Sequence, residues 1–308
     1  MMRCVAADDY HHFFPASPHC FLSREFIAIN AHKVDEVLYL LSDRENCRLG
    51  LVVGRSGRML RSPFSAPFGG FHFRSERHHT RVMDEFIDEL QTYAITLECD
   101  VVLTLPPFPY HPTFYGKMLN VLLRKGFVLD YPEIHHWADL SAFSGRYPDR
   151  TVHCHLRNAE NAGLVLARAE TPEERELAYR VVADNRALMN RPICMTLSDV
   201  EEVGEIIPLD IFVVKDRAGV ICASAFVYQG QDAVAQPVFW ADTLDGRSSR
   251  AMDFLLDGLW RHYKAAGFTK LDAGISSVGG IPNDGLIQFK ENHGCRASPR
   301  FTLSWRFA

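Results

Sequence analysis

The chain has 308 residues, of which 47% are hydrophobic and 23% charged, enough for two domains of ordinary size with real cores. Its formal net charge of −5 argues against a dedicated nucleic-acid scaffold with a broad basic face, although a local basic groove is compatible with it. No apolar run of about 18 residues is present, which argues against a membrane-spanning helix.

The N-terminus carries Asp8, Asp9 and several histidines instead of a basic region followed by an apolar run. This composition is unlike that of a signal peptide. Eight cysteines are scattered along the chain without a C-x-x-C pair, which favours free thiols in a reducing compartment. We therefore expect a cytoplasmic protein.

The first half of the chain predicts a hairpin followed by alternating helices and strands. Runs of apolar residues between turn signals indicate the strands, and apolar residues at helical spacing indicate the helices. Two prolines and two glycines make 61–71 a poor central strand, so we expect an edge or bulged segment there. The predicted strands are 34–41, 49–53 and 101–105, and the predicted helices are 80–98 and 114–124.

The second half repeats this alternation after a segment rich in glycine, proline and charge near residue 150. We place the boundary there, with a first domain over 1–156 and a second over 157–308, and expect 152–156 to be the first domain's last strand. Thr171, with proline and glutamate after it, is a strong helix start. The predicted strands are 211–214, 220–228, 233–240, 268–275 and 301–305, and the predicted helices are 172–189, 247–266 and a short one ending at Gly294.

An internal repeat relates the two halves. The segment 80–90, TRVMDEFIDEL, aligns with 249–259, SRAMDFLLDGL, and both copies have the order hairpin, strand, helix, strand, short helix. We infer a duplicated α/β domain. The identical pairs are Arg81 and Arg250, Met83 and Met252, Asp84 and Asp253, Asp88 and Asp257, and Leu90 and Leu259.

The repeat is informative where it breaks. Lys290 and Phe289 of the second copy align with Leu122 and Val121 of the first. This difference predicts a structural or acceptor-binding first domain and a catalytic second domain. The short helix at 283–294 places Lys290 at the end of a sheet, where a cation can stabilise the negative charge that develops in acyl transfer. The alternative is a solvated surface lysine whose stem covers Phe289.

The duplicated order of elements resembles two tandem acetyltransferase domains of the GNAT superfamily, which implies an α/β fold with two mixed sheets flanked by helices. The pattern N-x-G-L-x-x-F-K-x-x-x-G at 283–294 is similar to the Fem-type transferases and their acetyltransferase-like relatives. The segment 61–70 resembles their first domain. The residues that resemble their second domain are Asn185, Arg186, Pro192 and Met195.

Fem-type transferases take an amino acid from aminoacyl-tRNA and attach it to a peptide amine. The resemblance therefore implies an acyltransferase with Lys290 beside the reacting ester and a donor site that includes Asn283, Gly285 and Phe289. It implies no permanently bound cofactor. The co-substrate would be aminoacyl-tRNA or acyl-CoA, and the acceptor would be a peptide-like or small-molecule amine.

Ordinary GNAT domains use acetyl-CoA and hold its pyrophosphate on backbone N–H groups at a helix start, in an R/Q-x-x-G-x-G/A loop. The matching loop offers Gly246, Arg247, Ser248, Ser249 and Arg250 as donor-binding candidates. Arg250 replaces the central glycine that permits close approach. This departure favours aminoacyl-tRNA as the donor and leaves acyl-CoA open. A non-catalytic binding module that kept the fold is the third hypothesis.

Asp242 follows a predicted strand and is a candidate general base, although an aspartate in a turn is the more common role. No G-x-S-x-G elbow is present, so we favour direct transfer over a covalent intermediate. Adjacent histidines on a strand point to opposite faces, and we expect no metal site. The candidates for acceptor binding, with structural packing as an equal alternative, are Arg61, Phe68, Tyr115 and Trp240.

Overall fold

The computed structural model describes residues 1–42, 48–191 and 193–307. Pro192 of the Fem-like pattern lies outside this part of the chain. None of the described helices is both long and apolar enough to cross a membrane.

Two compact α/β units make up the chain, as predicted. The first changes to the second between His135 and His136, not at the predicted 156/157 boundary. The limits differ because two long strands belong partly to each unit. β7 (Val128–Asp139) carries the chain out of the first unit, and β15 (Arg296–Trp305) returns it there. The short segment 277–282 also belongs to the first unit.

The first unit has a mixed sheet with the strand order β1, β2, β3, β4, β6, β15, and β5 pairs with β3. β4 and β6 run parallel, and the other neighbours are antiparallel. The strands not yet given are β1 (Met2–Val5), β2 (Glu36–Ser42), β3 (Leu49–Ser56), β4 (Met59–Ser62), β5 (Phe71–Phe73) and β6 (Asp100–Thr104).

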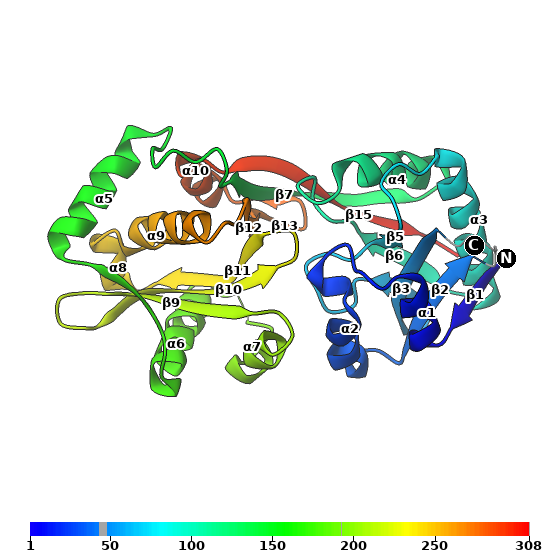
Figure 1. Ribbon diagram of the computed structural model, residues 1–308, viewed down its shortest axis with the longest axis horizontal. Coiled ribbons are helices and arrows are strands. Elements are labelled where there is room, and N and C mark those ends of the chain that lie inside the picture. The colour runs from blue at the N-terminus through cyan, green and yellow to red at the C-terminus, as the bar shows by residue number, and fades with distance from the viewer. Residues whose placement is uncertain (43–47, 192, 308) are drawn as a thin grey trace. The chain divides into compact units, whose positions relative to one another are not determined.

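Helices cover both faces of this sheet (Figure 1). Leu40 and Leu41 are adjacent in β2 and therefore point to opposite faces. Leu40 joins the core beneath α3 (Thr80–Thr96) and α4 (Pro112–Arg124), whereas Leu41 packs with residues of α1 (Ala7–Phe13) and α2 (Arg24–Asn30). The predicted apolar face of α3 is buried, and it consists of Met83, Phe86, Ile87, Leu90 and Ala94.

The second unit has the strand order β7, β12, β11, β10, β9, β8. α5 (Arg150–Ala162) and α9 (Ala251–Ala265) lie on one side of this sheet, and α6 (Pro172–Leu188) and α7 (Leu197–Gly204) lie on the other (Figure 1). Its remaining elements are β8 (Val165–Arg168), β9 (Leu209–Lys215), β10 (Ile221–Gly230), β11 (Val234–Asp242), α8 (Leu244–Ser248), β12 (Lys270–Ile275) and α10 (Asp284–Asn292). The segment 277–282 of the first unit forms the short pair β13 (Ser277–Val278) and β14 (Ile281–Pro282).

The prediction of a strand at 152–156 is wrong, because these residues lie within α5. Val152, Leu156 and Ala159 are its buried residues, and their spacing places them on one face of a helix. The side chain of Asp149 caps the start by accepting the Thr151 N–H at 2.7 Å. A short apolar run does not distinguish a strand from one turn of a buried helix, and the five residues 152–156 are too few to show the helical spacing.

The central pair of parallel strands in the second unit diverges. β11 and β12 are in register at Val234 with Lys270 and at Ala235 with Leu271, and each then continues beyond this pairing. The register between β10 and β11 shifts at Phe226, which marks a bulge in this region. A bulge bends its strand and re-aims the side chains that follow. The carboxyl end of β11, which carries Trp240 and Asp242, lies beyond the two positions paired with β12.

Leu122→Ala tests the inference that the first copy uses this position for packing. Leu122 is fully buried in α4 and lies in the core of the first unit. Deleting a buried leucine leaves a cavity and should lower the free energy of unfolding by about 2–5 kcal/mol in urea titrations. Leu123→Ala is the matched control, because Leu123 is 47% exposed. Its cost should be below about 1 kcal/mol, and equal losses at the two positions would contradict the assignment.

Candidate functional site

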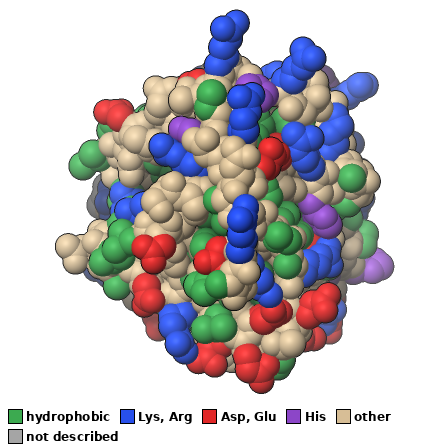
Figure 2. Space-filling view, turned by 90° about the vertical axis from the view of Figure 1, so that its left-hand side faces the viewer, with side chains coloured by type: hydrophobic (Ala, Val, Ile, Leu, Met, Phe, Trp, Pro, Cys, Tyr) green, Lys and Arg blue, Asp and Glu red, His purple; other side chains and the backbone are tan. Residues whose placement is uncertain are grey.

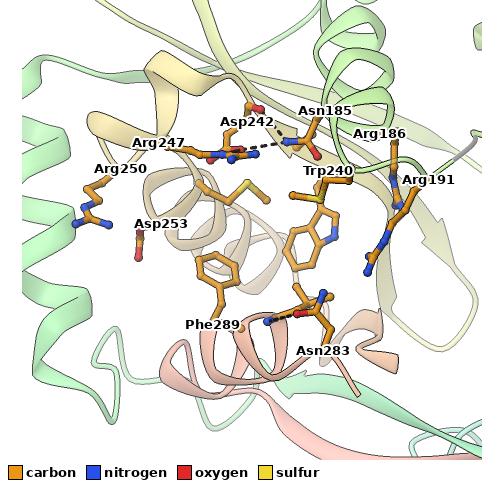
Figure 3. Close-up of a pocket in the computed structure, with 15 residues that line it drawn as sticks. Asn185, Arg186, Arg191, Trp240, Asp242, Arg247, Arg250, Asp253, Asn283 and Phe289 are labelled. Carbon is orange, nitrogen blue, oxygen red and sulfur yellow. Dashed lines mark hydrogen bonds and ion pairs between the residues drawn. The ribbon is translucent and has the colours of Figure 1, made fainter. Parts of the chain in front are cut away.

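A cavity of about 540 Å³ lies in the second unit (Figure 3). It is bounded by the end of α6, the end of β11, the segment from α8 into α9, and the first turns of α10. Arginines surround it, and its inner wall is apolar. The lining residues are Asn185, Arg186, Met189, Arg191, Trp240, Ala241, Asp242, Arg247, Arg250, Met252, Asp253, Asn283, Gly285, Leu286 and Phe289.

The end of α6 places two arginines side by side on one wall (Figure 3). Asn190 adopts a left-handed φ of 51°, and the Arg191 N–H donates to the Arg186 carbonyl at 2.9 Å. The Asn190 N–H also donates to the Ala187 carbonyl, and these two bonds are those of a Schellman ending. This ending brings Arg186, the third residue from the end of α6, near Arg191. Burial and the adjacent Arg191 charge lower the pKa of Arg186.

Asp242 stands at the end of β11, held on one side by its neighbours. The Arg247 Nε donates to its Oδ1 at 3.1 Å, and the Asn185 Nδ2 donates to its backbone carbonyl at 3.0 Å and its Oδ1 at 3.3 Å. Burial raises the pKa of the Asp242 carboxyl, and the Arg247 guanidinium opposes that rise. A carboxylate with a raised pKa in a cavity is suited to accept a proton.

The loop that matches the pyrophosphate-binding segment is folded into α8. Its Gly246 N–H donates to the Thr243 hydroxyl at 3.0 Å, and its Arg247 N–H donates to the Thr243 carbonyl at 3.1 Å. The Ser249 and Arg250 N–H groups donate to Asp245 and Arg247 carbonyls. These backbone donors are therefore satisfied within the loop itself.

The serine hydroxyls of the same loop are also engaged. Ser248 donates to the Asp245 carbonyl at 2.7 Å, and Ser249 donates to the Gly246 carbonyl at 3.1 Å. Gly246 is needed for a steric reason, because a Cβ there would lie 2.2 Å from the Cys222 carbonyl oxygen. Arg250 has a left-handed backbone, with φ 62°, a conformation that glycine adopts more readily than other residues.

Lys290 is buried beneath the cavity wall. Its side chain is 1% exposed, and its ammonium donates to the carbonyls of Gly274 at 3.0 Å and Ile275 at 2.9 Å. Its Nζ lies 5.7 Å from the centre of the Trp240 ring, which is part of the wall. The alternative of a solvated surface lysine is therefore wrong. Burial lowers the pKa of Lys290 to about 8.

Asp253 connects three elements around the cavity. Its Oδ1 lies 3.0 Å from the Nδ1 of His155 in α5 and 3.3 Å from the Nε2 of His293 at the end of α10. The Nδ1 of His293 lies 2.7 Å from the Phe289 carbonyl oxygen. Burial raises the pKa of Asp253, but the two histidines outweigh it and hold that pKa below its usual value. The cluster fixes α10 against the start of α9.

The structure brings together many of the predicted site residues. The predicted residues that line the cavity are Trp240, Asp242, Arg247, Arg250, Asn283, Gly285 and Phe289. Lys290 lies behind Trp240 of this lining, and Gly246, Ser248 and Ser249 lie in the loop that carries Arg247 and Arg250.

Three acceptor-binding candidates belong to the first unit, and none of them lines this cavity of the second unit. Phe68 is fully buried among the rings of His19, Phe21 and Tyr110. Tyr115 is 4% exposed, and its hydroxyl accepts the Phe71 N–H at 3.4 Å. Packing, the alternative given to both, accounts for these contacts. Arg61 is exposed on β4.

Sequence reasoning missed lining residues that have no motif of their own. Met189 and Arg191 are placed at the cavity by the Schellman ending of α6. The asparagine at position 190 is a local signal for such an ending, because asparagine tolerates a left-handed backbone. Asp253 was seen only as a repeat identity with Asp84. Its contact with His155 and His293 joins positions far apart in the chain and has no local signal.

No protein-family model and no curated protein matches the sequence. Solved structures do match over the full length. The crystal structure of FemX superposes with a TM-score of 0.69 at 10% identity, covering 99% of this chain and 97% of that one. L-PGS from Bacillus licheniformis gives 0.61 at 11% identity, covering 99% and 93%. A tandem GNAT protein from the clavulanic acid biosynthesis pathway gives 0.59 at 12% identity, covering 100% and 98%.

The chain has the tandem GNAT fold. The predicted likeness to GNAT and Fem-type proteins is thus confirmed at the level of the fold. Within this GNAT fold, the diverging pair β11 and β12 and the helix α9 that begins beside it bound the cavity of the second unit.

Lys290→Met tests the burial of the ammonium through the pH dependence of stability. The folded pKa of about 8 lies below the ordinary value of 10.5, so between these values the unfolded chain binds more protons. The free energy of unfolding of the wild type should therefore rise with pH in this window, relative to the variant, by about 3 kcal/mol. Urea titrations at several pH values measure the difference. Lys264→Met, at an exposed lysine, is the control, and parallel curves for wild type and Lys290→Met would contradict the burial.

Proposed function

We propose that this protein is an N-acyltransferase that moves an aminoacyl group from aminoacyl-tRNA onto the free amine of a peptide-like or small-molecule acceptor. The single observation that carries the choice of donor is the loop that leads into α9, in which Arg250 replaces the central glycine and the N–H groups before α9 already have acceptors. A GNAT domain that uses acyl-CoA holds a pyrophosphate on N–H groups of this loop and of the helix start that follows it. Here the N–H groups of Gly246, Arg247, Ser249 and Arg250 already donate within the loop.

The side chains around the cavity suit a nucleic-acid end. Single-stranded nucleic acids are bound by stacking of bases on aromatic rings and by arginine contacts to phosphates. Trp240 and Phe289 supply rings, and Arg186 and Arg191 supply guanidinium groups without an ion-pair partner among the described residues. Figure 2 shows Lys and Arg side chains gathered over the upper and central part of one face, and Asp and Glu side chains along its lower edge. Such a basic area favours RNA phosphates.

The proposed reaction is a direct transfer. The acceptor, as an ammonium, binds the Asp242 carboxylate and gives it one proton. The neutral nitrogen attacks the ester carbonyl carbon, and a tetrahedral species with a negatively charged oxygen forms. The C–N bond remains, the C–O bond to the ribose breaks, and the ribose oxygen takes up the proton that the attacking nitrogen loses. The products are an amide and the free 3′ end of the tRNA, and no oxidant or reductant is required.

Lys290 contributes positive charge behind the wall. Its ammonium is oriented by two carbonyl groups and shielded from water, so its field is weakly screened. A fixed charge of this kind stabilises a developing oxyanion more than it stabilises the neutral ester. We propose Lys290 as the cation of this site, acting across Trp240 in the conformation described here.

The choice of donor can be tested without knowledge of the acceptor. Isothermal titration with a short aminoacylated RNA hairpin and with acetyl-CoA should give measurable binding only for the RNA. Replacing both Arg186 and Arg191 with Gln should weaken RNA binding about tenfold or more, because each removes a phosphate contact. Arg58→Gln and Arg3→Gln, exposed arginines of the first unit, are the controls. Transfer of an acetyl group from acetyl-CoA would overturn the donor assignment, and failure to bind any donor would favour a binding module.

Asp242→Asn tests the proton acceptor. Because burial raises the pKa of Asp242, transfer by the wild type should fall as the pH drops through that raised pKa and the carboxylate becomes protonated. The asparagine cannot accept the proton, so the rate should fall about 10²–10⁴-fold and the acidic limb should disappear. Measuring kcat/KM against pH for both proteins decides the matter. An unchanged acidic limb in the variant would assign it to another group.

A further inference from the structure

A second cavity, of about 580 Å³, adjoins the first in the same unit. It lies between the outer face of α6, the turn joining β9 to β10, and the start of α8. The two cavities share Asn185 and Asp242 as lining residues. Asp242, which accepts hydrogen bonds from Asn185 and Arg247, therefore lies where the two cavities adjoin.

The second cavity exposes an unusual amount of apolar surface. Four of its lining side chains are large, apolar and poorly covered: Leu177 is 46% exposed, Leu188 65%, Val220 59% and Leu244 63%. Single exposed apolar residues are ordinary, but a group of them around one hollow is a feature of binding sites. A ligand with an apolar body would cover these side chains.

The charges of the two cavities are opposite. The first is lined by four arginines and two aspartates. The carboxylates that line the second are Glu174, Asp184, Asp242 and Asp245, and its two cations are Arg180 and Lys215.

Ion pairs do not remove the negative excess of the second cavity. Lys215 pairs with Glu174, and Arg180 pairs with Glu176 outside the lining set. Among the described residues, Asp184 and Asp245 have no cationic partner within ion-pair distance. The second cavity therefore attracts a cation, while the first attracts an anion.

We propose that the second cavity binds the acceptor, and that the acceptor is a primary ammonium attached to an apolar body. This inference rests on the proposed function and names its substrate class. A direct transfer requires both substrates to meet at one point. The anionic, nucleotide-borne donor enters the arginine-lined cavity, the cationic amine enters the carboxylate-lined cavity, and the two meet at Asp242.

Binding of simple probes tests the site independently of catalysis. Octylamine carries both features, octanoate reverses the charge, and octanol removes it. At low salt, isothermal titration should show octylamine binding at least about tenfold more tightly than octanoate or octanol, because only the ammonium is attracted by the carboxylates. Equal affinity for octanoate and octylamine would overturn the proposal.

Two variants test whether octylamine binds in the second cavity. Leu177→Ser should weaken octylamine binding about threefold or more, because it removes apolar cover, and Asp184→Asn should do the same by removing charge. Leu123→Ser is the matched control, since Leu123 is 47% exposed in the first unit. Unchanged affinity in both cavity variants, or an equal loss in the control, would overturn the site.

Transfer assays separate the two proposals. If the protein transfers the aminoacyl group from the aminoacylated RNA hairpin to octylamine, and Leu177→Ser raises only the KM for octylamine, both proposals stand. If acylation occurs and that KM is unchanged in Leu177→Ser and Asp184→Asn, the acceptor site is wrong and the acyltransferase function remains. If octylamine binds as described but no donor yields an amide, the ligand site remains and the proposed function is wrong.

Discussion

The divergence of β11 and β12 is the constraint on which the second unit depends. Two parallel strands that separate leave backbone carbonyls without their ladder partners, and buried carbonyls must find donors. The Lys290 ammonium donates to two of them, at Gly274 and Ile275. Burying this charge is costly, which is why its pKa falls, but removing it would leave both carbonyls unsatisfied. Trp240, from the other diverging strand, places its ring near the same ammonium.

The same divergence determines where the proposed site lies. β11 ends at Asp242 and the chain turns directly into α8, so the carboxylate, the arginines and the aromatic wall converge at one place. Helix α10 supplies the wall from the opposite side, and its position is fixed through the contacts of His293 with Asp253 and with the Phe289 carbonyl. Side chains carried by strand ends and helix starts are held more precisely than side chains on loops, as the proposed transfer requires.

Sequence reasoning reached those features that have a local signal. The repeat, the apolar face of α3, the Thr171 cap of α6 and the helix carrying Lys290 all follow from spacing and capping chemistry. It did not reach the return of β15 to the first unit, because the pairing of β15 with β6 joins positions that are distant in the chain. For the same reason it missed the contact of Asp253 with two histidines, and it could not decide whether Phe68 is buried or faces a ligand.

The comparison of the two short helices explains why one copy of the repeat carries the proposed site. In α4 the position matching Lys290 is Leu122, a fully buried apolar residue in the core of the first unit. In the sheet of that unit, the parallel strands β4 and β6 stay in register up to Ser62 with Leu103. A parallel pair that stays in register satisfies its own carbonyls, so an apolar side chain can fill the space beside it. In the second unit β11 and β12 are in register at Val234 with Lys270 and at Ala235 with Leu271, and the space beyond these pairs contains a cation instead. The lysine and the opening of the sheet therefore occur together in the second unit, whereas the first unit has a leucine at the matching position and a closed core.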